Sequence, residues 1–129
     1  MKSITNLMIA IYNLEKIDFM GYTYTKHNAS YHHLIVPRRL GGPETIENGA
    51  ILNGKTSHPY LHRIEYVDLD VFNAVTSEMI DINMKGYLDL SNLRSIDDIL
   101  TSFEREHCSD TTKKGKLLIK EEYTRRVKL

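Results

Sequence analysis

The chain has 129 residues, enough for one small domain with a modest core and too few for two substantial domains. Hydrophobic residues make up 41% and charged residues 26%, an ordinary composition for a soluble globular protein. The single cysteine, Cys108, excludes an internal disulfide and fits a reducing, cytoplasmic setting. No apolar run approaches the ~20 residues of a membrane-spanning helix, so we expect no membrane partner.

Positive and negative charges cancel over the whole chain but are unevenly distributed along it. Residues 25–66 carry five basic and three acidic side chains, residues 67–106 carry three basic and nine acidic, and residues 107–129 carry seven basic and three acidic. A neutral total gives no sign of nucleic-acid binding, whereas a basic segment can contact a phosphate backbone. The basic tail is therefore either a phosphate clamp or a solvated terminus, and the acidic segment should face away from any nucleic acid.

Apolar periodicity predicts an α+β fold in which amphipathic helices flank a short hairpin. Residues 7–17 repeat apolar side chains at three- and four-residue spacing, which predicts a helix. Residues 30–36 and 45–52 are rich in aromatic and branched side chains and predict two strands. Between the strands, Gly41 and Gly42 indicate an irregular surface turn.

Three further helices are expected after the second strand. The first is capped by Thr56 or Ser57 and runs to about residue 65. Apolar stripes predict the others over residues 70–84 and 91–107, and the end of the chain is open between a short helix, a strand and a frayed terminus. The chain then divides into an N-terminal helical segment (1–24), a central hairpin–helix motif (25–66), a helical support region (67–107) and a basic C-terminal tail (108–129).

The stretch 30–62 concentrates the chemistry of the chain. Four of the six histidines lie there, as the adjacent pair His32 and His33 and as His58 and His62, four residues apart. Adjacent residues of a strand point to opposite faces, so one histidine can hold a metal while the other faces a substrate. Histidines four apart on a helix share one face and can bind the same ion. The pattern predicts a metal site beside a second imidazole that can act as a base near neutral pH.

This stretch resembles the motif of the HNH endonuclease family, in which a two-stranded hairpin and a helix form a small ββα-metal finger. The resemblance covers roughly the middle third of the chain. It rests on the His-His pair followed by a proline, the Gly-Gly before Asn48, and the closing H-x-x-x-H. It implies a metal-dependent endonuclease that hydrolyses phosphodiester bonds in DNA, by a one-metal mechanism with a histidine as general base.

The resemblance also implies a role for each residue at a motif position. His32, His58 and His62 fall at the metal-ligand positions, and His33 falls at the position of the general base. Asn48 falls at the central asparagine, which orients the base or its loop through hydrogen bonds, although an asparagine is a ligand in some members. One divalent ion is implied, and three nitrogen ligands suit Zn, Mn, Ni or Co better than Mg, which prefers oxygen.

Three basic residues flank the histidines and are candidates for binding the substrate. Arg38, Arg39 and Lys55 could hold a phosphate backbone, and arginine suits phosphate geometry best; the alternative is a solvated rim. Glu65 follows His62 by three residues and is either its hydrogen-bond partner or an ordinary surface glutamate.

The chain departs from the family in one respect that concerns its stability. Many HNH proteins carry paired C-x-x-C motifs that bind a structural zinc, and this chain has none; Asn53 stands where a cysteine often follows the second strand. The flanking helices and the catalytic metal should then hold the fold. Two other functions stay open: a catalytically silent, metal-stabilised module that binds nucleic acid or protein, and a nuclease that acts on RNA.

Overall fold

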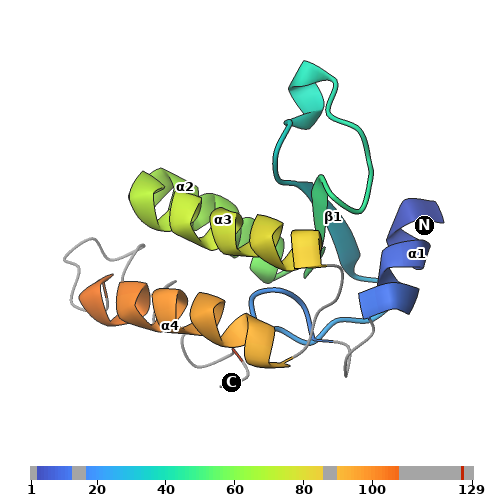
Figure 1. Cartoon of the computed structure of the whole chain (residues 1–129). Coiled ribbons are helices and arrows are strands. Elements are labelled where there is room, and N and C mark those ends of the chain that lie inside the picture. The colour runs from blue at the N-terminus through green and yellow to red at the C-terminus, as the bar shows by residue number, and fades with distance from the viewer. Residues whose placement is uncertain (1–2, 13–16, 86–89, 108–125, 127–129) are drawn as a thin grey trace.

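The structure is a computed structural model, and it describes residues 3–12, 17–85, 90–107 and 126. The described residues form an α+β fold with four α-helices and one two-stranded antiparallel hairpin, which confirms the predicted class (Figure 1). No described helix is both long and apolar enough to cross a membrane. The elements in chain order are α1 (Ser3–Tyr12), β1 (Ala29–His33), a 3₁₀ turn (Arg38–Leu40), β2 (Gly49–Asn53), α2 (Ser57–Val67), α3 (Leu69–Lys85) and α4 (Leu90–His107).

The two strands are shorter than the sequence pattern predicted. β1 ends at His33 because the side-chain Oδ1 of Asn48 accepts the N–H groups of Ile35 and Val36 at 2.9 and 2.8 Å. Those N–H groups are therefore unavailable for strand pairing. β2 begins only at Gly49, so the residues between the strands form a long loop that projects from the body of the fold (Figure 1).

The first helix also differs from the prediction, which extended it to Ile17. α1 begins earlier, at Ser3, and Ile17 instead forms an isolated antiparallel bridge with Thr23. A tight turn connects the two, and Gly21 adopts a positive φ of 88° that side-chain-bearing residues rarely adopt. The carboxylate of Asp18 closes this turn by accepting the N–H of Met20 at 2.9 Å.

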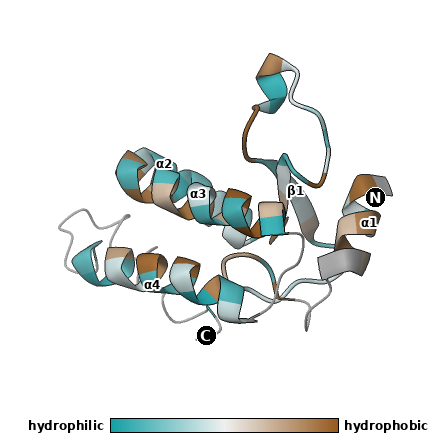
Figure 2. Cartoon of the chain, in the orientation of Figure 1, coloured by the Kyte–Doolittle hydropathy of each residue, from teal (hydrophilic) through white to brown (hydrophobic). Residues whose placement is uncertain are grey.

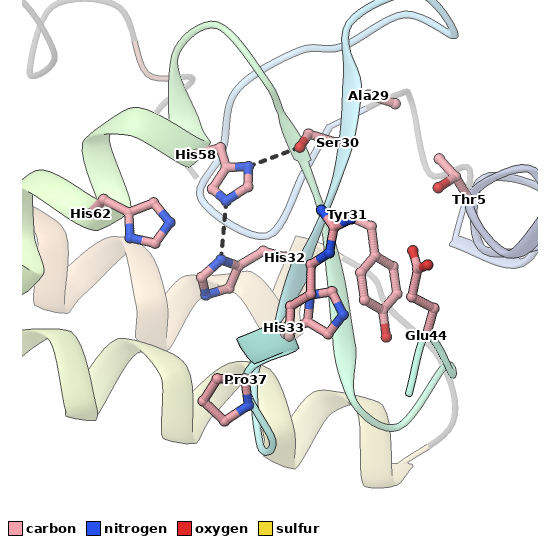
Figure 3. Close-up of a pocket in the computed structure, with 11 residues that line it drawn as sticks. Thr5, Ala29, Ser30, Tyr31, His32, His33, Pro37, Glu44, His58 and His62 are labelled. Carbon is pink, nitrogen blue, oxygen red and sulfur yellow. Dashed lines mark hydrogen bonds between the residues drawn. The ribbon is translucent and has the colours of Figure 1, made fainter. Parts of the chain in front are cut away.

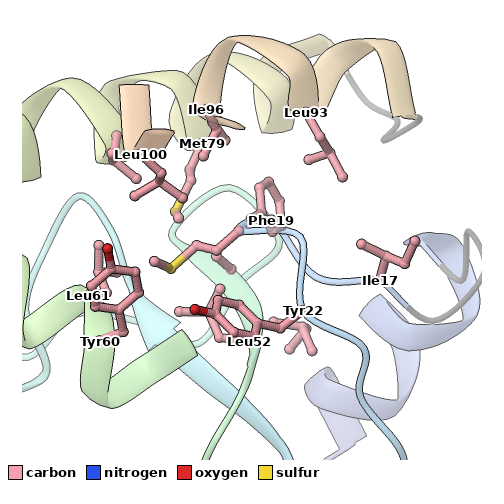
Figure 4. Close-up of a cluster of buried hydrophobic side chains, with 14 of the residues drawn as sticks. Ile17, Phe19, Tyr22, Leu52, Tyr60, Leu61, Met79, Leu93, Ile96 and Leu100 are labelled. Carbon is pink, nitrogen blue, oxygen red and sulfur yellow. The ribbon is translucent and has the colours of Figure 1, made fainter. Parts of the chain in front are cut away.

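The hydrophobic core lies where the hairpin, α2, α3 and α4 meet (Figure 4). Apolar residues on α4 recur every three or four positions and are buried, which agrees with the predicted helix over residues 91–107. Figure 2 shows hydrophobic and hydrophilic residues mixed along α3 and α4, as expected of helices with one buried face. The largest fully buried side chains are Tyr60, Phe19, Phe103, Met8, Met20, Leu52, Leu61, Ile64, Met79, Leu93, Ile96 and Leu100.

A buried carboxylate, Asp18, ties the N-terminal turn to the hairpin and to α2. Its Oδ2 accepts the backbone N–H of Asn53 at 2.8 Å and the hydroxyl of Ser57, the first residue of α2. The side chain of Asn53 in turn accepts the N–H groups of Lys55 and Thr56 at 2.9 and 3.2 Å. Thr56 occupies the predicted cap position but makes no capping hydrogen bond, so Asn53 satisfies the entry to α2 instead.

Arg126 is the only residue of the C-terminal tail that the structure describes, and it is buried. Its guanidinium forms ion pairs with Glu104 and Asp97 of α4, and Glu104 also accepts the hydroxyl of Tyr60 at 2.7 Å. Neither tail interpretation, phosphate clamp or solvated terminus, is correct for Arg126. The other tail residues lie outside the described part of the chain.

Removing the Arg126 side chain would leave the buried carboxylate of Glu104 without its charged partner. We expect Arg126→Ala to lower the free energy of unfolding by about 3–5 kcal/mol, as is typical when one member of a buried ion pair is lost. Urea denaturation followed by circular dichroism measures the change. Arg94→Ala, at an exposed position of α4, is the matched control and should change stability by less than about 0.5 kcal/mol. Equal effects of the two substitutions would contradict the prediction.

Asp18 should make stability depend on pH. Burial raises the pKa of Asp18 from 3.8 to about 6, against the opposing effect of the hydrogen bonds that it accepts. Between these values the folded protein keeps a proton that the unfolded chain has lost. The stability from this group is therefore complete below about pH 4 and is lost as the pH rises through about 6, a change of about 3 kcal/mol.

Urea titrations of the wild type and of Asp18→Asn isolate this effect, because the two proteins share every other titratable group. The stability advantage of the wild type over the variant should shrink between about pH 4 and about pH 7. A difference that stays constant over this interval would show that Asp18 keeps the same charge when the chain folds.

Candidate metal centre

The hairpin and α2 bring three imidazoles together. His32 lies on β1, and His58 and His62 lie one turn apart on α2 (Figure 3). The ring centroid of His32 lies 5.0 Å from that of His58 and 5.2 Å from that of His62. The rings of His58 and His62 are stacked, with their centroids 5.0 Å apart. One ring nitrogen from each residue lies within 4.8 Å of the others. These are the three residues that the sequence predicted as metal ligands.

Neighbouring polar side chains orient two of these rings. The hydroxyl of Ser30 lies 2.8 Å from Nδ1 of His58, which leaves Nε2 of His58 facing Nδ1 of His32 at 3.2 Å. Nδ1 of His62 lies 3.2 Å from the carboxylate of Glu65. Glu65 is therefore the partner of His62 that the sequence offered as one of two alternatives. Such hydrogen bonds fix which ring nitrogen carries the proton and which is free to bind a metal.

Burial favours the neutral form of the cluster. It lowers the pKa of His32 to about 3, with smaller contributions from the neighbouring imidazoles of His58, His62 and His33. Burial also lowers the pKa of His58, helped by His62 and His33. Both rings are therefore uncharged near neutral pH, and the neutral imidazole is the form that binds a metal ion.

The spacing of the ring nitrogens fits a single small cation. Two ligands of a tetrahedral zinc ion, each about 2.05 Å from it, lie roughly 3.3 Å apart. The 3.2 Å separation between Nδ1 of His32 and Nε2 of His58 is close to that value. Three nitrogen donors on two rigid elements could therefore hold one divalent ion and leave part of its coordination sphere to other ligands.

His33 lies on the other face of β1, as alternation along a strand requires. Its ring contacts the ring of Tyr31 edge-on, with centroids 4.9 Å apart and planes at 80°. The Nε2 atom of His33 is buried and has no hydrogen-bond partner among the described residues. Buried polar atoms are nearly always paired, and Nε2 of His33 is one of five buried side-chain atoms without a hydrogen-bond partner among the described residues.

One cavity of about 520 Å³ joins the three-histidine cluster to His33 (Figure 3). Of the three predicted substrate-binding residues, only Arg38 lines it. Arg39 is exposed on the same 3₁₀ turn, and Lys55 is exposed in the turn after β2. The cavity is lined by Thr5, Ala29, Ser30, Tyr31, His32, His33, Pro37, Arg38, Glu44, His58 and His62.

Asn48 holds the long loop and does not line the cavity. Its Oδ1 accepts two backbone N–H groups of the loop, and its Nδ2 donates to the carbonyls of Val36 at 3.1 Å and Pro43 at 2.9 Å. Both the oxygen and the nitrogen of this side-chain amide are therefore bonded to the backbone of the loop that carries Arg38. This geometry gives Asn48 the role of fixing the loop and leaves no oxygen lone pair for a metal.

Several residues that line the cavity were not predicted from the sequence. Ser30 and Tyr31 precede His32 and His33 by two residues each, so strand alternation places each of them on the same face as a histidine. That alternation is the signal that could have identified them. Thr5 on α1 and Glu44 in the loop reach the cavity only through the tertiary fold, and nothing in their local sequence indicates it.

Comparisons with protein-family models, curated proteins and solved structures give no match to this chain. Any inference about function therefore rests on the residues and geometry of the site.

The hydrogen bond from Ser30 to His58 predicts a measurable effect on metal affinity. Ser30→Ala should weaken zinc binding by about 10- to 100-fold, because the His58 ring loses the partner that orients it. Competition titration with a chromophoric zinc chelator measures the dissociation constant. Ser95→Ala removes a serine that bonds to the exposed side chain of Glu78, away from the cavity, and should leave the constant unchanged. Equal affinities for the two variants would contradict the prediction.

Proposed function

We propose that this protein is a metal-dependent endonuclease of the HNH type that hydrolyses phosphodiester bonds in DNA. In this proposal β1, β2 and α2 form a ββα-metal finger, and His32, His58 and His62 hold one divalent ion. The proposal extends the resemblance of the sequence motif. Support comes from the way in which the four motif histidines converge on one cavity.

The observation that carries the proposal is that His33 lines the same cavity as the three-histidine cluster. A structural zinc site needs its ligands and their hydrogen-bond partners, and it needs no fourth imidazole beside them. A hydrolytic site needs a base within reach of a water molecule beside the metal. The presence of His33 therefore favours an enzyme over a silent binding module.

In the proposed reaction His33, Arg38 and Asn48 have different roles. His33 takes a proton from the attacking water, a contribution typically worth about 10²–10⁴-fold. Arg38 faces the same cavity and binds a phosphate oxygen of the substrate. Asn48 keeps the loop of Arg38 in place through its four hydrogen bonds. His32, His58 and His62 would hold a divalent ion, which would supply Lewis-acid chemistry for the phosphate and the leaving oxygen.

Plasmid cleavage tests the proposal directly. Metal-stripped protein should be inactive, and added Mn²⁺, Ni²⁺, Co²⁺, Zn²⁺ or Mg²⁺ should restore nicking or linearisation with at least one ion. His33→Ala should lower the cleavage rate by about 10²–10⁴-fold while metal affinity persists. His27→Ala, an exposed histidine outside the cavity, is the matched control and should cleave at the wild-type rate.

Parallel digestion of single-stranded and structured RNA separates the substrate classes. If the protein cleaves RNA and not DNA, the proposed substrate is RNA and the proposed mechanism is unchanged. Tight metal binding without cleavage of any nucleic acid would contradict the nuclease and support a binding module. Full activity of His33→Ala would contradict the assignment of the base.

A further inference from the structure

We propose that Tyr31 is a positioning residue that fixes the imidazole of His33 in the orientation needed for proton transfer. This inference rests on the proposed function, since it assigns Tyr31 a part in the same site. Nothing in the sequence motif assigns a role to Tyr31. Three contacts together hold the tyrosine ring in one position.

The first contact is with His33 itself. Tyr31 and His33 lie two residues apart on β1, so their side chains project from the same face of the hairpin. Their rings meet edge to face, with centroids 4.9 Å apart, an arrangement that aromatic rings prefer. His33 Nε2 has no hydrogen bond in the described structure, so this ring contact is the restraint on the imidazole that the structure identifies.

The second contact anchors the far end of the tyrosine. The hydroxyl of Tyr31 donates to the carbonyl of Thr45 at 2.5 Å, with the carbonyl of Pro43 at 3.4 Å. Both carbonyls belong to the loop whose base Asn48 holds, and Asn48 itself donates to the carbonyl of Pro43. The tyrosine therefore links the loop that carries Arg38 to the strand that carries His33.

The third contact is with Gly49 and explains why a residue without a side chain stands there. Gly49 is the register partner of His33 across the hairpin, and the ring of Tyr31 lies over it. A Cβ added at Gly49 would overlap the tyrosine ring at its Cζ, Cε2 and Oη atoms. Since the strand backbone here is held by pairing with β1, an alanine at this position would displace the ring and not the strand. The missing side chain of Gly49 thus leaves the space that the ring of Tyr31 occupies.

These contacts give a test by double-mutant cycle. Tyr31→Ala removes the ring, and Gly49→Ala displaces it without replacing any residue that lines the cavity. Each should lower kcat by about 10- to 100-fold, the scale expected when a catalytic group moves by about 1 Å. Zinc affinity should stay within about twofold in both variants, because the three histidines of the cluster are unchanged. Tyr31→Phe keeps the ring and should retain more activity than either alanine variant.

The combination of the two substitutions separates positioning from loss of stability. In the Tyr31→Ala background, Gly49→Ala has no ring to displace, so the double variant should cleave as fast as Tyr31→Ala alone. Additive losses would overturn the proposal. So would wild-type kcat in a folded, metal-binding Tyr31→Ala protein. Thermal unfolding of all four proteins identifies any variant that is unfolded at the assay temperature.

Nuclear magnetic resonance gives a readout that does not depend on cleavage. The carbon-bound ring protons of His33 should shift in Tyr31→Ala and Gly49→Ala, because the ring current of the tyrosine is lost or moved, and should stay near their wild-type positions in Tyr31→Phe. Unchanged His33 signals in both alanine variants would overturn the inference even in an active enzyme. A wild-type protein with the expected ring contact but no nuclease activity would instead show that the proposed function is wrong.

Discussion

The register of one short hairpin decides which chemistry this chain can perform. Pairing of His32 with Ala50 and of His33 with Gly49 turns His32 toward α2 and His33 away from it. A slip of one residue would exchange the two imidazoles and break the three-histidine cluster. Hydrogen bonds just beyond the strands fix the register at both ends of the hairpin. Oδ1 of Asn48 accepts the N–H groups of Ile35 and Val36 at one end, and the N–H of Gly54 donates to the carbonyl of Asn28 at 2.6 Å at the other.

Buried polar side chains connect the parts of this small fold. Asp18 joins the N-terminal turn to the hairpin and α2, and Asn83 on α3 donates to the carbonyl of Gly49 at 2.7 Å. Arg126 adds a buried ion pair with Glu104 of α4. Each group is costly to bury without its partners, so the partners specify one arrangement of the helices around the hairpin.

Local patterns predicted the helices and the histidine cluster, since both depend on spacing along one element. The i,i+4 pair on α2 and the adjacent pair on β1 are visible in the sequence and converge in the structure. The missed features are single polar residues whose partners lie far away in the chain. Asp18 bonds to a residue 35 positions on, and Arg126 to one 22 positions back. No periodicity encodes such pairs, and Asn48 likewise shortened both strands through contacts that propensity does not include.

In the function proposed above, three imidazoles and His33 form one hydrolytic site that works with one ion. The most direct test titrates metal-stripped protein with the ion that activates it and follows metal binding and DNA cleavage in the same samples. We expect the cleavage rate to rise in proportion to occupancy of the three-histidine site and to saturate at one ion per chain. Full occupancy of that site without cleavage, or cleavage that persists when His62→Ala abolishes the binding, would contradict it.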